Sequence, residues 1–405
     1  MSQREPNRLK NVIGDLQIFG GRPAFDEKLH VGRPNIGNRQ RFAERVNEIL
    51  ERKWLTNNGP CVEEFEQRIQ DLTGVKHCVA ICNATIALEI AIRALGLEGE
   101  VIVPSFTFVA TAHALLWQGI TPIFCDIDPQ THTIAPDKIE SLITPRTTGI
   151  IAVNLWGNSC DIAGLEKIAT GRGLKLLFDS AHAFGCSYQG RMIGNFGNAE
   201  VFSFHATKFV NSSEGGAIVT NDDNLSQAAR LMQNFGFTSY DQIACVGTNG
   251  KMSEICAAMG LTNLESMTDF IEINRRHRKQ YAEELAGLSG LTLLPTNQEE
   301  ECNYQYVVLE IDAARTVVTR DELMQILHRE NVLARRYFYP GCHRMKPYNL
   351  SRLTLVETER VSDRVLSLPT GTSITPSDIS TICGMIRLVI TNGREVSEKL
   401  RAERS

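Results

Sequence analysis

The chain has 405 residues, of which 42% are hydrophobic, so it is long enough to form two domains with substantial cores. Its formal net charge of −5 gives no general attraction to nucleic acid or to an anionic membrane surface. The first 30 residues lack the apolar stretch of a signal peptide, and the eleven cysteines include no CxxC pair. We therefore expect a cytoplasmic protein with reduced thiols and without a metal site.

The longest uncharged run, residues 101–125, is not expected to cross a membrane. It contains Pro104 and Pro122 and divides into strand, helix and strand.

The N-terminal part predicts an irregular arm followed by a helix. Residues 1–36 contain FGGRPAF as their only apolar anchor. A helix is predicted over residues 41–54, where Phe42, Val46 and Leu50 recur at four-residue spacing. The following cluster LTNNGP, which includes Asn57, has the composition of a turn.

The next strand and helix meet at a candidate site for an anion. Residues 77–82 predict a buried strand and residues 85–95 a helix ended by Gly96, so Asn83, Ala84 and Thr85 lie at the turn between them. Free N–H groups and the positive end of the helix dipole suit a phosphate at such a turn. The alternative is that Asn83 only caps the helix.

Further strands alternate with helices as far as residue 179. Strands are predicted at 101–105, 122–127, 148–153 and 174–179, with helical stretches at 137–142 and 161–171. This alternation indicates an α/β fold with a central, mostly parallel sheet flanked by helices, and ligands at the carboxyl ends of its strands. Phe108 and Asp179 follow two of these ends. Phe108 is either a stacking surface or a core aromatic, and Asp179 either a ligand-binding carboxylate or a helix cap.

Lys208 lies between two predicted apolar strands, at 199–204 and 217–220, in a segment with few other charges. A lysine at a strand end is open to partial desolvation, which lowers its pKa and makes the neutral amine available as a nucleophile for an aldehyde. A carboxylate such as Asp179 is the group that holds a pyridinium nitrogen. Together the two residues supply what pyridoxal phosphate chemistry requires.

The composition changes from about residue 275, where NRRHRKQYAEEL predicts a charged helix leading into a smaller domain. A strand at 304–312 and a helix at 320–330 indicate that this domain is α+β. We therefore divide the chain into an arm (1–36), a large α/β domain (37–274) and a smaller C-terminal domain (275–405).

The string FDSAHAFG…GNFGNAEVFSFHATKFVNSSEGGAIVTND resembles the DegT/StrS-type nucleotide-sugar aminotransferases, and the likeness extends over nearly the whole chain. The resemblance implies the fold-type-I architecture, with pyridoxal 5′-phosphate bound to Lys208 and its ring nitrogen held by Asp179. It implies further cofactor contacts: the phosphate with Asn83, Ala84, Thr85 and Ser203, the ring with Phe108, and the phenolic oxygen with His182. It also implies a homodimer, in which Asn249 reaches the phosphate in the neighbouring subunit.

The family likeness also implies the substrates. ARRYFYPGCHRMKPY resembles a YPxxxHxxPxY pattern that borders the sugar-nucleotide pocket, which places Tyr339 and His343 there and Asn57 near the substrate. L-Glutamate is the implied amino donor and 2-oxoglutarate its product, with pyridoxamine 5′-phosphate as the form between the two half-reactions. Lys208 then acts as general base and acid.

Three strings, FHATK…EGG, NFGF and NGKMSE, resemble members that convert dTDP-4-keto-6-deoxy-D-glucose to dTDP-4-amino-4,6-dideoxy-D-glucose. The alternatives are a 3-ketosugar aminotransferase of the same family and, from a different class, a non-catalytic sensor that binds pyridoxal phosphate. The related 3-dehydratases have histidine where this chain has Lys208, which argues against that branch. His205 has no role derived from the sequence.

Overall fold

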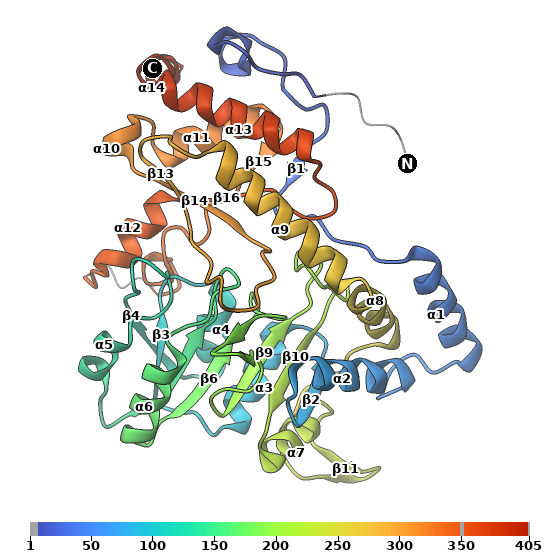
Figure 1. Ribbon diagram of the computed structural model, residues 1–405. Helices are drawn as coiled ribbons and strands as arrows, with labels where there is room; N and C mark the ends of the chain where they lie inside the picture. Colours follow the sequence, from blue (N-terminus) through green and yellow to red (C-terminus); the bar gives the residue numbers. More distant parts are fainter. Residues whose placement is uncertain (1–6, 349–351, 404–405) are drawn as a thin grey trace.

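A mixed seven-stranded sheet lies at the centre of the computed structural model, which describes residues 7–348 and 352–403 (Figure 1). Its strand order is β2–β10–β9–β6–β5–β3–β4, and β10 runs antiparallel to both of its neighbours. The other neighbouring pairs are parallel, which confirms the predicted mostly parallel sheet. In sheet order the strands are His77–Ile81 (β2), Gly216–Thr220 (β10), Ala199–Ser203 (β9), Lys175–Asp179 (β6), Thr147–Val153 (β5), Glu100–Pro104 (β3) and Thr121–Cys125 (β4).

Helices cover both faces of this sheet, because successive side chains of a strand point to opposite sides. In β3, Ile102 packs into one core, whereas Val101 and Val103 pack into the other. The first core is closed by Pro60–Thr73 (α2), Ile162–Arg172 (α6) and Glu254–Leu264 (α8). The second is closed by Ala84–Ala94 (α3), Val109–Leu116 (α4) and Asp223–Met232 (α7). The sheet is thus the middle of three layers.

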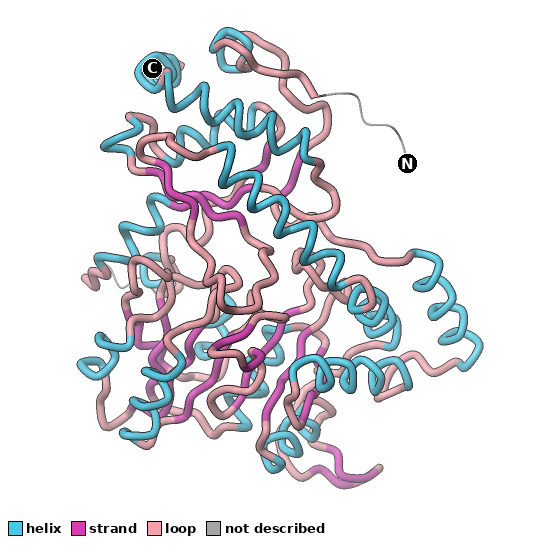
Figure 2. The backbone as a smooth tube through the Cα atoms, in the orientation of Figure 1, coloured by secondary structure: helices cyan, strands magenta, loops and turns pink. Residues whose placement is uncertain are grey.

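A long helix, α9 (Met267–Glu284), connects this sheet to a smaller α+β region (Figures 1 and 2). Phe270 near its start packs in the first core, and Tyr281 near its end is buried in the core of the smaller region. That region contains an antiparallel sheet of Leu291–Leu293 (β13), Val307–Ile311 (β14) and Val365–Leu368 (β16), with Arg320–Arg329 (α11) and Pro376–Thr391 (α13) packed on it. The predicted domain boundary at residue 275 lies inside α9, and the division into domains stays a prediction.

The N-terminal arm packs on the smaller region. Its strand Leu29–His30 (β1) pairs in parallel with Val332–Leu333 (β15). Leu16 and Ile18 are buried in the same core as α11 and α13. The expectation that FGGRPAF is the only apolar anchor of the arm is therefore wrong, because single apolar residues outside it reach this core. Residues 1–6 of the predicted arm, and 349–351 and 404–405 of the predicted C-terminal domain, lie outside the described residues.

The predicted elements are found with small shifts at their ends. The predicted helix at 41–54 is Arg39–Arg52 (α1), and the one at 137–142 divides into Pro136–Ile139 (α5) and a 3₁₀ turn, Glu140–Leu142 (η3). The remaining elements are Ile13–Asp15 (η1), Gln17–Phe19 (η2), Ser187–Tyr188 (β7), Arg191–Met192 (β8), Phe237–Ser239 (β11), Gln242–Ile243 (β12), Ala313–Thr316 (α10), Cys342–Arg344 (η4), Val356–Arg364 (α12) and Gly393–Ala402 (α14). Within the described ranges, no helix is both long and apolar enough to cross a membrane.

Candidate active site

A cavity of about 580 Å³ opens where the central strands end. Its floor is formed by residues at or just after the carboxyl ends of β2, β3, β5, β6 and β9, and its roof by residues of the smaller region. The parallel strands bring these ends together at one edge of the sheet. Eight residues selected from the sequence line it: Asn83, Ala84, Thr85, Phe108, Asp179, His182, Ser203 and Lys208.

Lys208 reaches this cavity from the turn between β9 and β10. Its backbone N–H donates to the carbonyl of His205 over 2.8 Å, which closes the turn and fixes where the side chain begins. Burial lowers the pKa of the Lys208 amine to about 8, although the nearby Asp179 carboxylate acts in the opposite direction. Desolvation dominates because the hydration free energy that the ammonium ion loses on burial exceeds the stabilisation that one nearby carboxylate provides. The amine is therefore neutral in a substantial fraction of molecules near neutral pH.

Asp179 is the last residue of β6, and its carboxylate is buried in the floor of the cavity. Thr111 Oγ1 donates to Oδ2 over 2.8 Å, and the Ala181 N–H donates to Oδ1 over 3.2 Å. Burial raises the pKa of this carboxyl group, while the two hydrogen bonds and the charge of Lys208 lower it. The carboxylate is placed to accept a further hydrogen bond from a donor in the cavity.

Thr111 was not selected from the sequence. It lies in the first turn of α4, three residues after Phe108. Residues three positions apart share a face of a helix, so this spacing is the sequence feature that indicates a place for Thr111 beside Phe108. Phe108 itself is the N-cap residue of α4, and 57% of its surface is exposed, which leaves a ring face free to stack on a ligand.

The turn between β2 and α3 shows the capping role considered for Asn83. Asn83 Oδ1 accepts from the Ile86 N–H over 2.9 Å, so this side chain caps the helix. Ala84 and Thr85 line the cavity at the first turn, where helical N–H groups have no partner within the helix. Gly216 of β10 lies so close that a Cβ there would be 2.7 Å from the Ala84 nitrogen. Little space is left on this side of the turn, and its anion-binding role stays a prediction.

His182 lies beside a tyrosine from the smaller region. Its Nε2 is 3.1 Å from the Tyr306 hydroxyl, and the two ring centres are 4.3 Å apart. Burial holds the pKa of His182 well below its usual range, with the charge of Lys208 adding to the effect, so the imidazole is neutral. Its Nδ1 is buried and has no hydrogen-bond partner among the described residues. This atom is available to a ligand. No local sequence pattern indicated that Tyr306 would contact His182.

The cavity also contains a histidine–carboxylate pair at its rim. His205 Nδ1 is 2.8 Å from Thr207 Oγ1, and its Nε2 is 3.5 Å from Glu214 Oε1. These three residues line the cavity together with Lys208.

Four predicted residues lie outside this lining. Asn57 is exposed in the turn after α1, and Asn249 is exposed and bridges Asn234. His343 is fully buried, with Nδ1 2.6 Å from Ser105 Oγ and Nε2 3.1 Å from Glu359 Oε1. Tyr339 lines an adjoining hollow. The ligand-binding roles of these four residues stay predictions.

The donor set suits one small ligand with three distinct ends: an anion at the α3 turn, an aldehyde at Lys208 and a protonated ring nitrogen at Asp179. Among residues 7–348 and 352–403, no three His, Cys, Asp or Glu side chains are grouped as metal ligands.

Comparison with known proteins gives matches over most of the chain. A profile of the DegT/DnrJ/EryC1/StrS aminotransferase family matches residues 37–387. A dTDP-4-amino-4,6-dideoxy-D-glucose transaminase of Shigella dysenteriae is 35% identical over 365 residues, or 90% of this chain and 99% of that protein. A GDP-perosamine synthase of Caulobacter vibrioides is 33% identical over 90% of this chain and 98% of its own. The crystal structure of DesI in the presence of its TDP-sugar product superposes with a TM-score of 0.93 at 48% identity, covering 96% of this chain and 100% of that one.

Proposed function

The chain belongs to the DegT/DnrJ/EryC1/StrS aminotransferase family, and we propose that it aminates C4 of dTDP-4-keto-6-deoxy-D-glucose with L-glutamate as amino donor. The product is then dTDP-4-amino-4,6-dideoxy-D-glucose. Support for this sugar comes from the relatives whose name contains it, at 35% and 36% identity. The observation that carries the reaction type is that Lys208 and the buried Asp179 carboxylate line the same cavity at the ends of the central strands.

We infer that the cofactor is pyridoxal 5′-phosphate, because the unsatisfied groups of the cavity match its parts. The first-turn N–H groups at Ala84 and Thr85 suit its phosphate, and Asp179 suits its ring nitrogen. The buried Nδ1 of His182 is an unpaired polar atom that a ring oxygen is able to satisfy. When bound, the cofactor supplies an aldehyde that carries the amino group and a protonated ring that withdraws electrons.

Lys208 is the residue that moves protons in this proposal. Its amine, with a pKa of about 8, is neutral often enough to take a proton from Cα of glutamate. In the second half-reaction the same amine returns a proton to C4 of the sugar. The partly buried position of the side chain favours both steps, because a nearby water would compete for the proton.

Asp179 and His182 each keep one protonation state in this mechanism, Asp179 as an anion and His182 as a neutral imidazole. Asp179 keeps a proton on the ring nitrogen, and Thr111 orients its carboxylate. His182 stays neutral, so it adds no positive charge beside Lys208 and does not discourage protonation of that amine. The family resemblance gives 2-oxoglutarate as the first product released.

We further infer that the enzyme acts as a homodimer with shared active sites. The segment around the β11–β12 hairpin exposes several large apolar residues, namely Phe235, Phe237, Ile243 and Val246. A large apolar surface of this kind is typical of an interface. Asn249 follows this segment and is exposed, which is consistent with its predicted reach into a neighbouring subunit.

The experiment that tests the proposal is a panel of nucleotide-linked 3-keto and 4-keto sugars offered to the cofactor-loaded enzyme with glutamate. Nitrogen at C4 of the dTDP-linked sugar, located by NMR, is the expected result. Nitrogen at C3 would identify the sibling 3-aminotransferase, and preference for a GDP-linked sugar would overturn the nucleotide assignment. Lys208→Arg is the matched control, because it keeps the positive charge and removes the primary amine, and it should be inactive.

A further inference from the structure

Asn35 is a buried residue of the N-terminal arm that contacts the turn carrying Lys208. It lies between β1 and α1, and only 4% of its surface is exposed. Its Nδ2 donates to the carbonyl oxygen of Phe209, the residue after Lys208, over 3.0 Å. In return, Nδ2 of Asn211 donates to the Asn35 carbonyl over 2.8 Å. Two buried hydrogen bonds thus join the arm to the chain directly after Lys208.

The backbone on the other side of Lys208 is held by the segment that precedes β14. Nε2 of Gln305 in this segment donates to the carbonyl of Thr207 over 2.6 Å. The Lys208 N–H itself donates to the His205 carbonyl. The Lys208 side chain therefore starts from a backbone that Gln305 fixes on one side and Asn35 fixes on the other.

The amide oxygen of Asn35 contacts the smaller region. Oδ1 accepts hydrogen bonds from the backbone N–H and from Oγ1 of Thr372, each over 2.9 Å. The preceding residue, Gly371, has a φ of +96°, and a Cβ there would lie 3.0 Å from Asn35 Oδ1. The amide group of Asn35 thus joins the Lys208 turn to the loop before α13, and both of its polar atoms are engaged.

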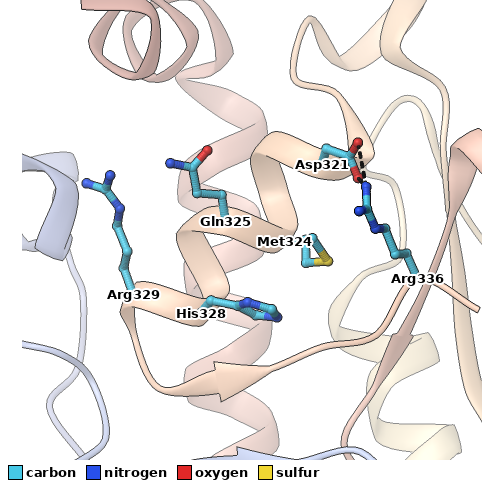
Figure 3. Close-up of a pocket in the computed structure, with 6 residues that line it drawn as sticks. All are labelled: Asp321, Met324, Gln325, His328, Arg329 and Arg336. Carbon is cyan, nitrogen blue, oxygen red and sulfur yellow. Dashed lines mark hydrogen bonds and ion pairs between the residues drawn. The ribbon is translucent and has the colours of Figure 1, made fainter. Parts of the chain in front are cut away.

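Earlier residues of the arm are tied to the same region. The buried carboxylate of Glu330, which follows α11, accepts from the backbone N–H groups of Gln17 and Ala24 over 2.6 and 2.7 Å. Figure 3 shows α11 itself, where Asp321 near its start pairs with Arg336 of the segment after β15 at 3.1 Å. The arm is therefore attached to the smaller region before β1 as well as after it, which makes it a firm support for the turn that it contacts.

We propose that Asn35 is a positioning residue, which holds the backbone at Lys208 so that the amine reaches the reacting atoms in the cavity. This inference rests on the proposed function and adds to it a residue of the N-terminal arm. The carbonyl of Phe209 is buried, and a buried carbonyl without a partner costs free energy. If Asn35 no longer donates to this carbonyl, the turn rearranges to satisfy it, and the start of the lysine side chain moves with the turn. A displacement of about 1 Å is enough to slow a reaction by about 100-fold.

The first test follows the Lys208 amine in the cofactor-free protein, so it depends on neither sugar nor amino donor. Asn35→Leu keeps a side chain of similar size and removes the donor and the acceptor. The pH midpoint for labelling of Lys208 by trace acetic anhydride, near 8 in the unaltered protein, should rise, because a loosened turn exposes the amine to water.

Asn38→Leu is the matched control, since it makes the same change three residues further along the arm. The Asn38 side chain is exposed and accepts from the Arg41 N–H over 3.1 Å, as the cap of α1. Its loss should lower Tm and leave the labelling midpoint of Lys208 near pH 8. The pair of variants therefore separates an effect on the position of Lys208 from a loss of stability.

The second test follows the cofactor-loaded enzyme through the half-reaction with glutamate, measured by cofactor absorbance. In Asn35→Leu the rate at saturating glutamate should fall by about 10-fold or more, while the half-saturating concentration changes by less than about twofold. Asn38→Leu should keep both values. If Asn35→Leu does not fold, Asn211→Leu removes the second bond between arm and turn and takes its place in both tests.

An unchanged labelling midpoint and an unchanged rate in the folded variant would overturn the proposal. An equal shift of the midpoint in Asn38→Leu would overturn it too, because general loosening of the arm would then explain the effect. If the unaltered enzyme does not react with glutamate, the proposed function fails, and the labelling midpoint alone decides whether Asn35 holds Lys208 in place.

Discussion

In the cofactor-free protein, the Lys208 amine is expected to be neutral in half of the molecules near pH 8. Burial lowers the pKa of its amine from 10.5 to about 8. At pH 7.5 a group with that pKa is neutral in about a quarter of the molecules, against about one in a thousand for an ordinary lysine. The amine should therefore be a few hundred times more available at this pH than an unperturbed lysine. Between pH 8 and 10.5 the unfolded chain binds more protons at this residue, so its contribution to stability rises with pH across that window.

Competitive labelling of the cofactor-free protein with trace acetic anhydride measures this availability. The labelled fraction of the Lys208 peptide, determined by mass spectrometry as a function of pH, should reach half its maximum near pH 8. The exposed Lys279 in the same sample is the internal reference. Lys208→Arg should remove the labelled peptide, which shows that the signal comes from this amine.

Asp179→Asn sharpens the test, because it should move two measurements in opposite directions. The carboxylate stabilises the charged amine, so its removal should lower the pKa of Lys208 further and increase labelling at pH 7.5. Transamination should nevertheless fall by on the order of 100-fold, because the ring nitrogen loses its anionic partner. A labelling midpoint near pH 10 in the unaltered protein, or an upward shift in Asp179→Asn, would refute the reasoning.

Two further predictions concern residues that adjoin Asp179 and Ala84. Thr111→Val removes the hydroxyl that donates to Asp179, and kcat should fall by about 10-fold, whereas Thr111→Ser should restore most of the rate. Unchanged kinetics in the valine variant would mean that the hydrogen bond does not position the carboxylate. Gly216→Ala places a Cβ 2.7 Å from the Ala84 nitrogen and should weaken binding of pyridoxal phosphate and lower Tm. Its control is Gly384→Ala in a helix, where the new Cβ meets no atom within 4 Å and stability should rise by about 0.5–1 kcal/mol. Equal cofactor affinity in the two variants would contradict a tight cradle at the α3 turn.

Local patterns in the sequence were sufficient for the central sheet and for the residues at its strand ends. Apolar runs of five to seven residues gave β2, β3, β5, β6 and β9, because each strand is buried on both faces. Parallel strands must place their carboxyl ends along one edge. Asn83, Asp179 and Lys208 were therefore expected in one cavity, where the structure places them.

Tertiary structure decided the contacts that join distant parts of the chain. Thr111 reaches Asp179 across 68 positions, and Tyr306 reaches His182 across 124. Neither contact has a local period, because each depends on how separate elements pack. Among the residues that the structure describes, the same packing leaves the Arg335 guanidinium without a carboxylate partner where two cavities meet, while the adjacent Arg336 is paired with Asp321. Residue type and spacing thus determined which reactive side chains lie at the strand ends. Only the fold determined which other side chains orient these groups or change their charge, since those interactions arise from proximity in space.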